Sequence, residues 1–155
     1  AAMLLAWAAP LSAQGTEPSS GAIDAQVWSV VSSTVVEHDI AGMAATYHPD
    51  AVVVTPHGAM PVARALAGWG QAMEAMKRNG SEASVAFRFS LRQDGAETAF
   101  ESGMFNYAVT DSAGATTRYI IPFEALIVRK NDRWLIVMER QFAAADETAW
   151  NAMAR

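Results

Sequence analysis

The sequence predicts a single α+β domain in which three N-terminal helices pack on one face of a curved antiparallel β-sheet. Two observations lead to this prediction. Up to Asn79, apolar residues recur mainly at helical spacing, whereas beyond it they alternate with polar residues at the period of a strand. Helices that come first, followed by consecutive strands, are typical of the α+β class. The length of 155 residues matches one domain.

Three helices and one short strand are predicted in the N-terminal half. Residues 23–35 place their apolar side chains on one helical face, and residues 40–47 form a second helix that ends before Pro49. Residues 51–55 are too short and too β-branched for a helix, so they predict a strand. Residues 62–78 predict the third helix, which the following Asn-Gly pair ends.

Four longer strands are predicted in the C-terminal half, over residues 84–92, 96–110, 116–129 and 133–142. The segments between them are rich in Asp, Asn, Gly and Ser, which favour hairpin turns. The tail over residues 146–155 can close as a short helix. The four strands therefore form an antiparallel meander that the helices cover on one face.

Composition excludes several classes of protein. With 52% apolar and 17% charged residues the chain is not disordered, and no apolar run reaches the roughly 18 residues of a membrane-spanning helix. The net charge of −5 and the absence of any run of Lys or Arg longer than two argue against nucleic-acid binding. Without cysteine there is no disulfide, thiolate metal site or cysteine nucleophile. No phosphate-binding loop or other nucleotide motif is present, and we expect no cofactor.

The first 13 residues differ from the rest of the chain. They form a short apolar run that ends in Leu-Ser-Ala, which resembles the apolar core and cleavage site of a signal peptide. The alternative is a buried or frayed apolar helix of the mature protein. We therefore expect a partial signal peptide over residues 1–13, a flexible lead-in over 14–21 and one domain over 22–155. Such a protein would be periplasmic or secreted.

Three strings carry a resemblance to a known family. "HDIAGMAATYHPDAVVVTPHG" is similar to the helix-helix-strand opening of the NTF2-like superfamily, which includes SnoaL-like and ketosteroid-isomerase-like proteins. "ETAFESGMFNYAVTDSAG" resembles the long third strand of that family, and "RYIIPFEALIVRKNDRWLIVMERQF" resembles its closing hairpin. The resemblance covers residues 23–142 and implies an NTF2-like cone around an apolar cavity. Two functions are open: cofactor-free acid–base chemistry of the isomerase, dehydratase or cyclase type, or non-catalytic binding of a small molecule or a protein.

The resemblance disfavours the steroid isomerase mechanism. It places the family's general base at Thr55 and its oxyanion donor near Val31, and neither side chain can do that chemistry. The only matching element is the carboxylic acid two residues after Pro122, which is Glu124. If the domain is an enzyme, the resemblance therefore implies a SnoaL-like isomerase or lyase that needs no cofactor.

Glu124 is the first candidate catalytic residue. Strand alternation places it on one face with Ile120, Pro122, Leu126 and Val128. If that face lines the cavity, an apolar environment favours the protonated carboxyl, which can then donate a proton. The alternative is an ion pair with an arginine such as Arg88 or Arg118, without chemistry.

Four further residues are candidates. The resemblance implies that Glu139 points into the cavity, and antiparallel pairing would place it near Glu124, where Glu101 from the preceding strand could join. A shift of one residue in register would instead turn Glu139 and Glu101 to solvent. Tyr107 either donates its hydroxyl into the cavity or is an ordinary strand aromatic. His57 is either a general base at the cavity mouth or a solvated loop histidine. The three histidines have no metal-ligand spacing, so no metal site is predicted.

The expected ligand is a small apolar molecule. Trp28 and Trp69 either line its pocket or belong to the core. The expected ligand-binding residues are Trp28, Val31, Thr55, Trp69, Phe105, Ile120, Leu126 and Gln141. The strand over residues 116–129 is apolar on both faces, which predicts a homodimer through the face that carries Tyr119, Ile121 and Phe123.

Overall fold

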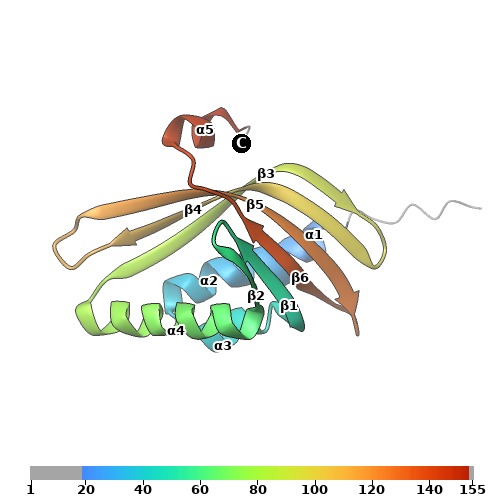
Figure 1. The fold of residues 1–155 in the computed structure, drawn as a ribbon, viewed down its shortest axis with the longest axis horizontal. Helices are drawn as coiled ribbons and strands as arrows, with labels where there is room; N and C mark the ends of the chain where they lie inside the picture. Colours follow the sequence, from blue (N-terminus) through green and yellow to red (C-terminus); the bar gives the residue numbers. More distant parts are fainter. Residues whose placement is uncertain (1–18, 154–155) are drawn as a thin grey trace, which may run out of the picture.

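The computed structural model describes residues 19–153 and has the predicted α+β class (Figure 1). The predicted signal peptide over residues 1–13 lies outside the described residues, so cleavage and export stay predictions. The end of the predicted lead-in is helical, because α1 (Ser20–Ile23) begins there. The hydroxyl of Ser19 donates to the carbonyl of Gly95 at 3.0 Å, which ties this start to the sheet.

Within residues 19–153, the helical segments before the long strands differ in detail from the three helices that were expected. α1, η1 (Asp24–Trp28) and α2 (Ser29–Glu37) follow one another without a break, and η1 is a π-helical turn. α3 (Ile40–Ala44) is shorter than predicted. α4 (Val62–Asn79) comes after two strands. The Asn-Gly stop is confirmed, because Gly80 takes a left-handed φ of 72°.

In the described part of the chain, six strands form one mixed sheet in the order β2-β1-β6-β5-β4-β3. Their bounds are β1 (Tyr47–Thr55), β2 (Gly58–Pro61), β3 (Glu82–Asp94), β4 (Thr98–Thr110), β5 (Thr116–Lys130) and β6 (Arg133–Gln141). The expectation of a purely antiparallel sheet is wrong, because β1 runs parallel to β6. The sequence also did not predict β2, a four-residue partner of β1.

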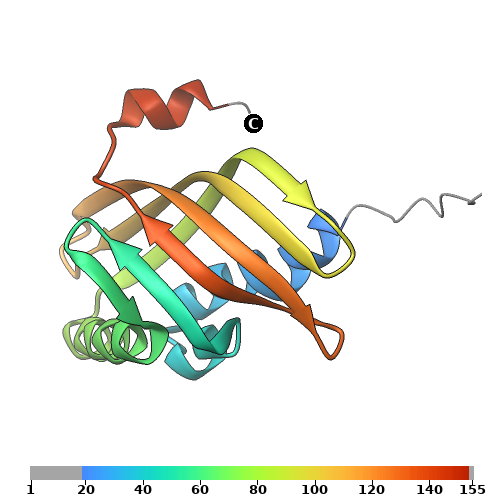
Figure 2. The ribbon, with the colours of Figure 1, turned by 45° about the vertical axis from the view of Figure 1, so that its right-hand side comes forward.

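The sheet curves around α2, α3 and α4, and α5 (Glu147–Ala152) lies on the opposite side (Figures 1 and 2). We call the face toward α2–α4 the inner face and the other the outer face. α5 is attached by Trp150, which is buried and whose ring centroid lies 4.1 Å from the guanidinium carbon of Arg88. No helix within residues 19–153 is long and apolar enough to cross a membrane.

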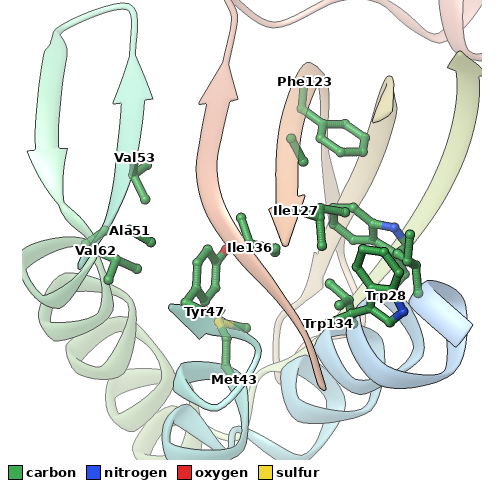
Figure 3. Packing of buried hydrophobic residues seen from close by; sticks show 14 of the residues in the cluster. Trp28, Met43, Tyr47, Ala51, Val53, Val62, Phe123, Ile127, Trp134 and Ile136 are labelled. Atoms are coloured by element: carbon green, nitrogen blue, oxygen red, sulfur yellow. The ribbon is translucent and has the colours of Figure 1, made fainter. Parts of the chain in front are cut away.

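The hydrophobic core lies between the inner face and the helices (Figure 3). Trp28 from η1 and Phe123 from β5 are in its centre, with ring centroids 5.3 Å apart. Ile127 and Ile136 from adjacent strands have no exposed surface. Burying a side chain of this size contributes about 1.5–3 kcal/mol. The core therefore fixes η1 against the centre of the sheet.

Candidate functional site

A cavity of about 390 Å³ lies between the inner face and the helical layer. Most of its wall is apolar. Its aromatic members are Trp28, Tyr47, Trp69, Phe87, Phe105, Tyr107, Tyr119 and Phe123. Methionines and valines from the helices complete much of the rest. Among the described residues that line it, Glu139 is the only carboxylic acid, and none is a lysine, arginine or histidine.

Glu139 is held in this wall by two hydrogen bonds. It lies on β6 and is 7% exposed. The Tyr47 hydroxyl donates to its Oε2 at 2.5 Å, and Gln141 Nε2 donates to its Oε1 at 2.6 Å. Tyr47 begins β1, which runs parallel to β6, so the bond joins two strands that are far apart in sequence. The carboxyl is therefore fixed in position before any ligand arrives.

Burial raises the pKa of both members of the Glu139–Tyr47 pair. Burial raises the pKa of Glu139 above its ordinary value, although the hydrogen bonds from Gln141 and Tyr47 partly oppose this. Burial and the neighbouring Glu139 raise the pKa of Tyr47 well above its ordinary value, so Tyr47 keeps its proton and donates. A carboxyl oxygen pair offers about four lone-pair sites, of which two are used here. Glu139 can thus still accept a proton or a hydrogen bond from a bound molecule.

Two tyrosines supply further polar groups in the wall. Tyr107 on β4 pairs with Tyr119 on β5, and their ring centroids are 6.3 Å apart. The Tyr107 hydroxyl contacts Met76 Sδ on α4 at 3.7 Å. Burial, with Tyr119 nearby, raises the pKa of Tyr107. Tyr107 therefore lines the cavity, and its hydroxyl contacts another residue of the cavity wall, Met76.

A second buried carboxyl, Glu101, lies in the same cross-strand row as Glu139, with Ala125 between them. Glu101 has no exposed surface and is not part of the cavity wall, but it accepts a hydrogen bond at 2.5 Å from the indole Nε1 of Trp28, which is part of that wall. Arg92 donates from Nε to Glu101 Oε1 at 2.8 Å and also pairs with Asp24. The register shift that would have turned Glu101 and Glu139 to solvent is excluded, since both face inward.

The expected position of Glu124 is wrong. It pairs across the sheet with Ser102 and Arg140, which places it on the outer face, and Arg140 Nη1 lies 3.8 Å from its carboxylate. An ion pair was the alternative interpretation, but the partner is Arg140 rather than Arg88 or Arg118. Because Glu124 points outward, it does not lie near Glu139 in the cavity.

Two expected ligand-binding residues share that outer face and do not line the cavity. Leu126 is 40% exposed, and Ile120 is covered by a bridge to Ala145. Conversely Tyr119, Ile121 and Phe123 line the cavity, so they are not the free face that was expected to form a dimer. Both faces of β5 are apolar, and only its pairing with β4 and β6 distinguishes them.

Thr55 ends β1 and His57 lies in the turn to β2, and neither residue lines the cavity. The Thr55 hydroxyl donates to the Gly58 carbonyl at 3.3 Å and accepts from the His57 amide at 3.2 Å. His57 is exposed, as in the alternative of a loop histidine. Within residues 19–153, no cluster of three His, Cys, Asp or Glu side chains could hold a metal ion.

Five of the eight residues expected to bind the ligand do line the cavity: Trp28, Val31, Trp69, Phe105 and Gln141. Sequence reasoning missed Tyr47, which was assigned to the end of a helix. The available signal was Pro49, because the residue directly before a proline, here His48, favours extended backbone, and Tyr47 precedes it. A strand that begins at Tyr47 would have placed this phenol on the same face as Ala51 and Val53, which are also buried.

No protein-family model and no curated protein matches the sequence. Solved structures do. Aln2 from a Streptomyces species is 16% identical with a TM-score of 0.67, over 86% of this chain and 94% of that one. A ketosteroid isomerase-like protein from Erwinia carotovora atroseptica is 16% identical with a TM-score of 0.54, over 80% and 97%. An NTF-2 like protein from Shewanella oneidensis is 15% identical with a TM-score of 0.55, over 79% and 98%.

At these identities the likeness concerns the fold. The chain has the fold that NTF2-like and ketosteroid isomerase-like proteins share, and the resemblance stated from the sequence is confirmed at this level. One fold of this kind hosts many unrelated activities, so function has to be argued from the site.

Proposed function

We propose that this NTF2-like domain binds a small, largely apolar molecule in its cavity and that Glu139 transfers a proton to or from it. The observation that carries the proposal is the position of Glu139, a buried carboxyl in an apolar, aromatic wall. A cavity of this size with a few convergent polar groups is the usual form of a small-molecule site. The reaction would be an isomerisation, dehydration or cyclisation without a cofactor.

The surroundings of Glu139 suit acid–base catalysis. A general acid or base works best when its pKa lies near the working pH, and burial raises the pKa of Glu139 in that direction. Tyr47 and Gln141 hold both oxygens, so the carboxyl does not have to be oriented during the reaction. Glu124, the candidate that matched the family motif, has neither burial of this kind nor access to the cavity.

The first prediction concerns proton exchange. The native protein should speed the exchange of the α-protons of 1-tetralone, a bicyclic ketone, in D₂O, followed by ¹H NMR. Glu139→Gln should slow this exchange about 100-fold or more, because positioned general acid–base groups typically contribute that much. Glu124→Gln is the matched control, because it removes one carboxylate from the outer face of the adjacent strand. It should leave the exchange rate unchanged.

The result also separates catalysis from plain binding. If calorimetry shows that 1-tetralone binds but Glu139→Gln exchanges its protons at the native rate, the proton-transfer role is wrong. The domain would then be the non-catalytic ligand-binding module that the resemblance also allows.

The domain also forms a homodimer in this proposal, through the outer face rather than the face that lines the cavity. Phe100, Leu126, Met138 and Val52 make one cross-strand row there, and Leu126 and Val52 are 40% and 39% exposed. The next row contains the Glu124–Arg140 pair, so the surface carries both charges beside an apolar stripe. Such a surface can pair with a second copy of itself across a twofold axis.

The second prediction tests this interface. The native protein should sediment as a dimer at micromolar concentration, and Leu126→Glu should sediment as a monomer, because it places a charge in the apolar row. Val36→Glu is the matched control, since Val36 is 59% exposed on α2, away from the outer face. It should stay dimeric. A native protein that sediments as a monomer contradicts the dimer.

A further inference from the structure

We propose that the ligand of this cavity is a lipophilic cation, an aromatic or alicyclic amine whose ammonium group pairs with Glu139. The proposal rests on the proposed binding function and names the class of molecule that is bound. It depends on a comparison between the two buried carboxyls of the inner face, Glu139 and Glu101.

The two carboxyls differ in one respect. Glu101 is fully buried and has its own cation, because Arg92 contacts its Oε1 at 2.8 Å. Glu139 is nearly as buried, but its two partners, Tyr47 and Gln141, are neutral. No lysine, arginine or histidine within residues 19–153 lines the cavity or makes an ion pair with Glu139. A buried carboxylate is costly without an opposite charge, so a cationic ligand would supply what the chain itself does not.

The aromatic wall supports the same choice. A cation is attracted to the faces of aromatic rings, and Trp and Tyr attract it most strongly. Tyr47 and Trp69 lie beside each other in the wall next to Glu139, with ring centroids 6.2 Å apart. Arginines elsewhere in the chain stack on Phe89, Trp150 and Phe142, and none of these three rings lines the cavity. The rings of the cavity are therefore left for a ligand.

The cavity wall also disfavours a negatively charged ligand. An anionic ligand would meet Glu139 without any cationic side chain to offset the repulsion. A neutral ligand would gain only an ordinary hydrogen bond at Glu139. Hydrogen bonds to charged groups contribute more than neutral ones, by roughly a factor of ten in affinity.

The test compares three naphthalenes of similar shape by isothermal titration calorimetry at pH 7.5. These are 1-naphthylmethylamine, which is a cation, the neutral 1-naphthalenemethanol and the anion 1-naphthoate. We expect the amine to bind the native protein about tenfold more tightly than the alcohol, and the naphthoate to bind most weakly. Glu139→Gln should bind the amine and the alcohol with equal affinity. Glu124→Gln lowers the negative charge of the protein equally but lies outside the cavity, so it should keep the tenfold preference.

A second variant keeps the test sharp if Glu139→Gln does not fold. Tyr47→Phe leaves the carboxyl in place and frees one of its lone pairs, so it should prefer the amine at least as strongly as the native protein. If the native protein binds the alcohol as tightly as the amine, the cation assignment is wrong while binding of a small molecule stands. If none of the three probes binds at millimolar concentration, both proposals are wrong.

Discussion

Gly103→Ala is expected to destabilise the domain by about 3 kcal/mol or more, which is a large share of the roughly 5–15 kcal/mol that keeps a typical domain folded. A Cβ at position 103 would lie 2.0 Å from the carbonyl oxygen of Arg88 and 2.9 Å from the Cα of Phe89. Both atoms belong to the backbone of β3, so neither can rotate away as a flexible side chain would. β3 and β4 would have to separate partway along their length, at one edge of the sheet.

The position explains why the effect is large. Gly103 on β4 pairs with Phe89, and the register of β3 and β4 shifts directly after this pair, between Phe89 and Leu91. Irregularities of this kind bend a strand and increase its twist. A glycine that lets the two backbones approach closely therefore supports the curvature of the sheet around the cavity.

The measurement is urea unfolding followed by circular dichroism, with Gly68→Ala as the matched control. Gly68 lies inside α4, and a Cβ built there meets nothing within 4 Å. The free energy of unfolding of Gly68→Ala should therefore be roughly 0.5–1 kcal/mol higher than that of the native protein, because alanine stabilises a helix more than glycine does. A Gly103→Ala protein that unfolds at the native urea concentration would contradict the close approach of the two strands.

The sequence predicts well those helices and strands whose signals lie in residues close together along the chain. The long strands and the third helix were expected near their observed positions, because alternation, helical spacing and the Asn-Gly stop after α4 are local signals. The pairing of β1 with β6 is different. These strands are separated by most of the domain, and no local pattern indicates that they run parallel.

The candidate site shows the same limit. Alternation correctly separates Glu124 from Phe123, but it does not say which of them faces the cavity. Both faces of β5 are apolar, one because it lines the cavity and the other because it carries part of the apolar row on the outer face. The partners of β5 decide the matter, since Phe123 pairs with Gln141 and Glu124 with Arg140. Glu139 was expected in the cavity from the resemblance to the family, since alternation shows only that it shares a face of β6 with Gln141, and both residues line the cavity.

Arg92→Ala is the second substitution expected to have a large effect, with a loss of about 3 kcal/mol in the free energy of unfolding. It leaves Glu101 without a cation at a position with no exposed surface. The pKa of Arg92 shows how closely the group is bound: burial lowers it, but the bonds to Asp24 and Glu101 more than offset this and the pKa is raised. Asp24 and Trp28, the first and last residues of η1, both depend on this network.

The matched control is Arg129→Ala, which removes an equally short ion pair at the surface. Arg129 Nη2 lies 2.8 Å from Asp132, whose side chain is 90% exposed. Exposed pairs contribute about 1 kcal/mol or less, so the control should change the unfolding free energy only slightly. Equal losses in the two variants would mean that the buried pair with Glu101 has no special role.

A double variant separates loss of the pair from loss of packing. Arg92→Met combined with Glu101→Leu removes both charges, so no uncompensated carboxylate is left in the core. It should therefore recover most of the stability that Arg92→Ala loses, because apolar replacements of a buried ion pair are often neutral. Trp28 would still lose its acceptor, and its indole lines the cavity. We thus expect the double variant to unfold at a urea concentration between those of Arg92→Ala and the native protein, closer to the native one, and to bind 1-naphthylmethylamine more weakly.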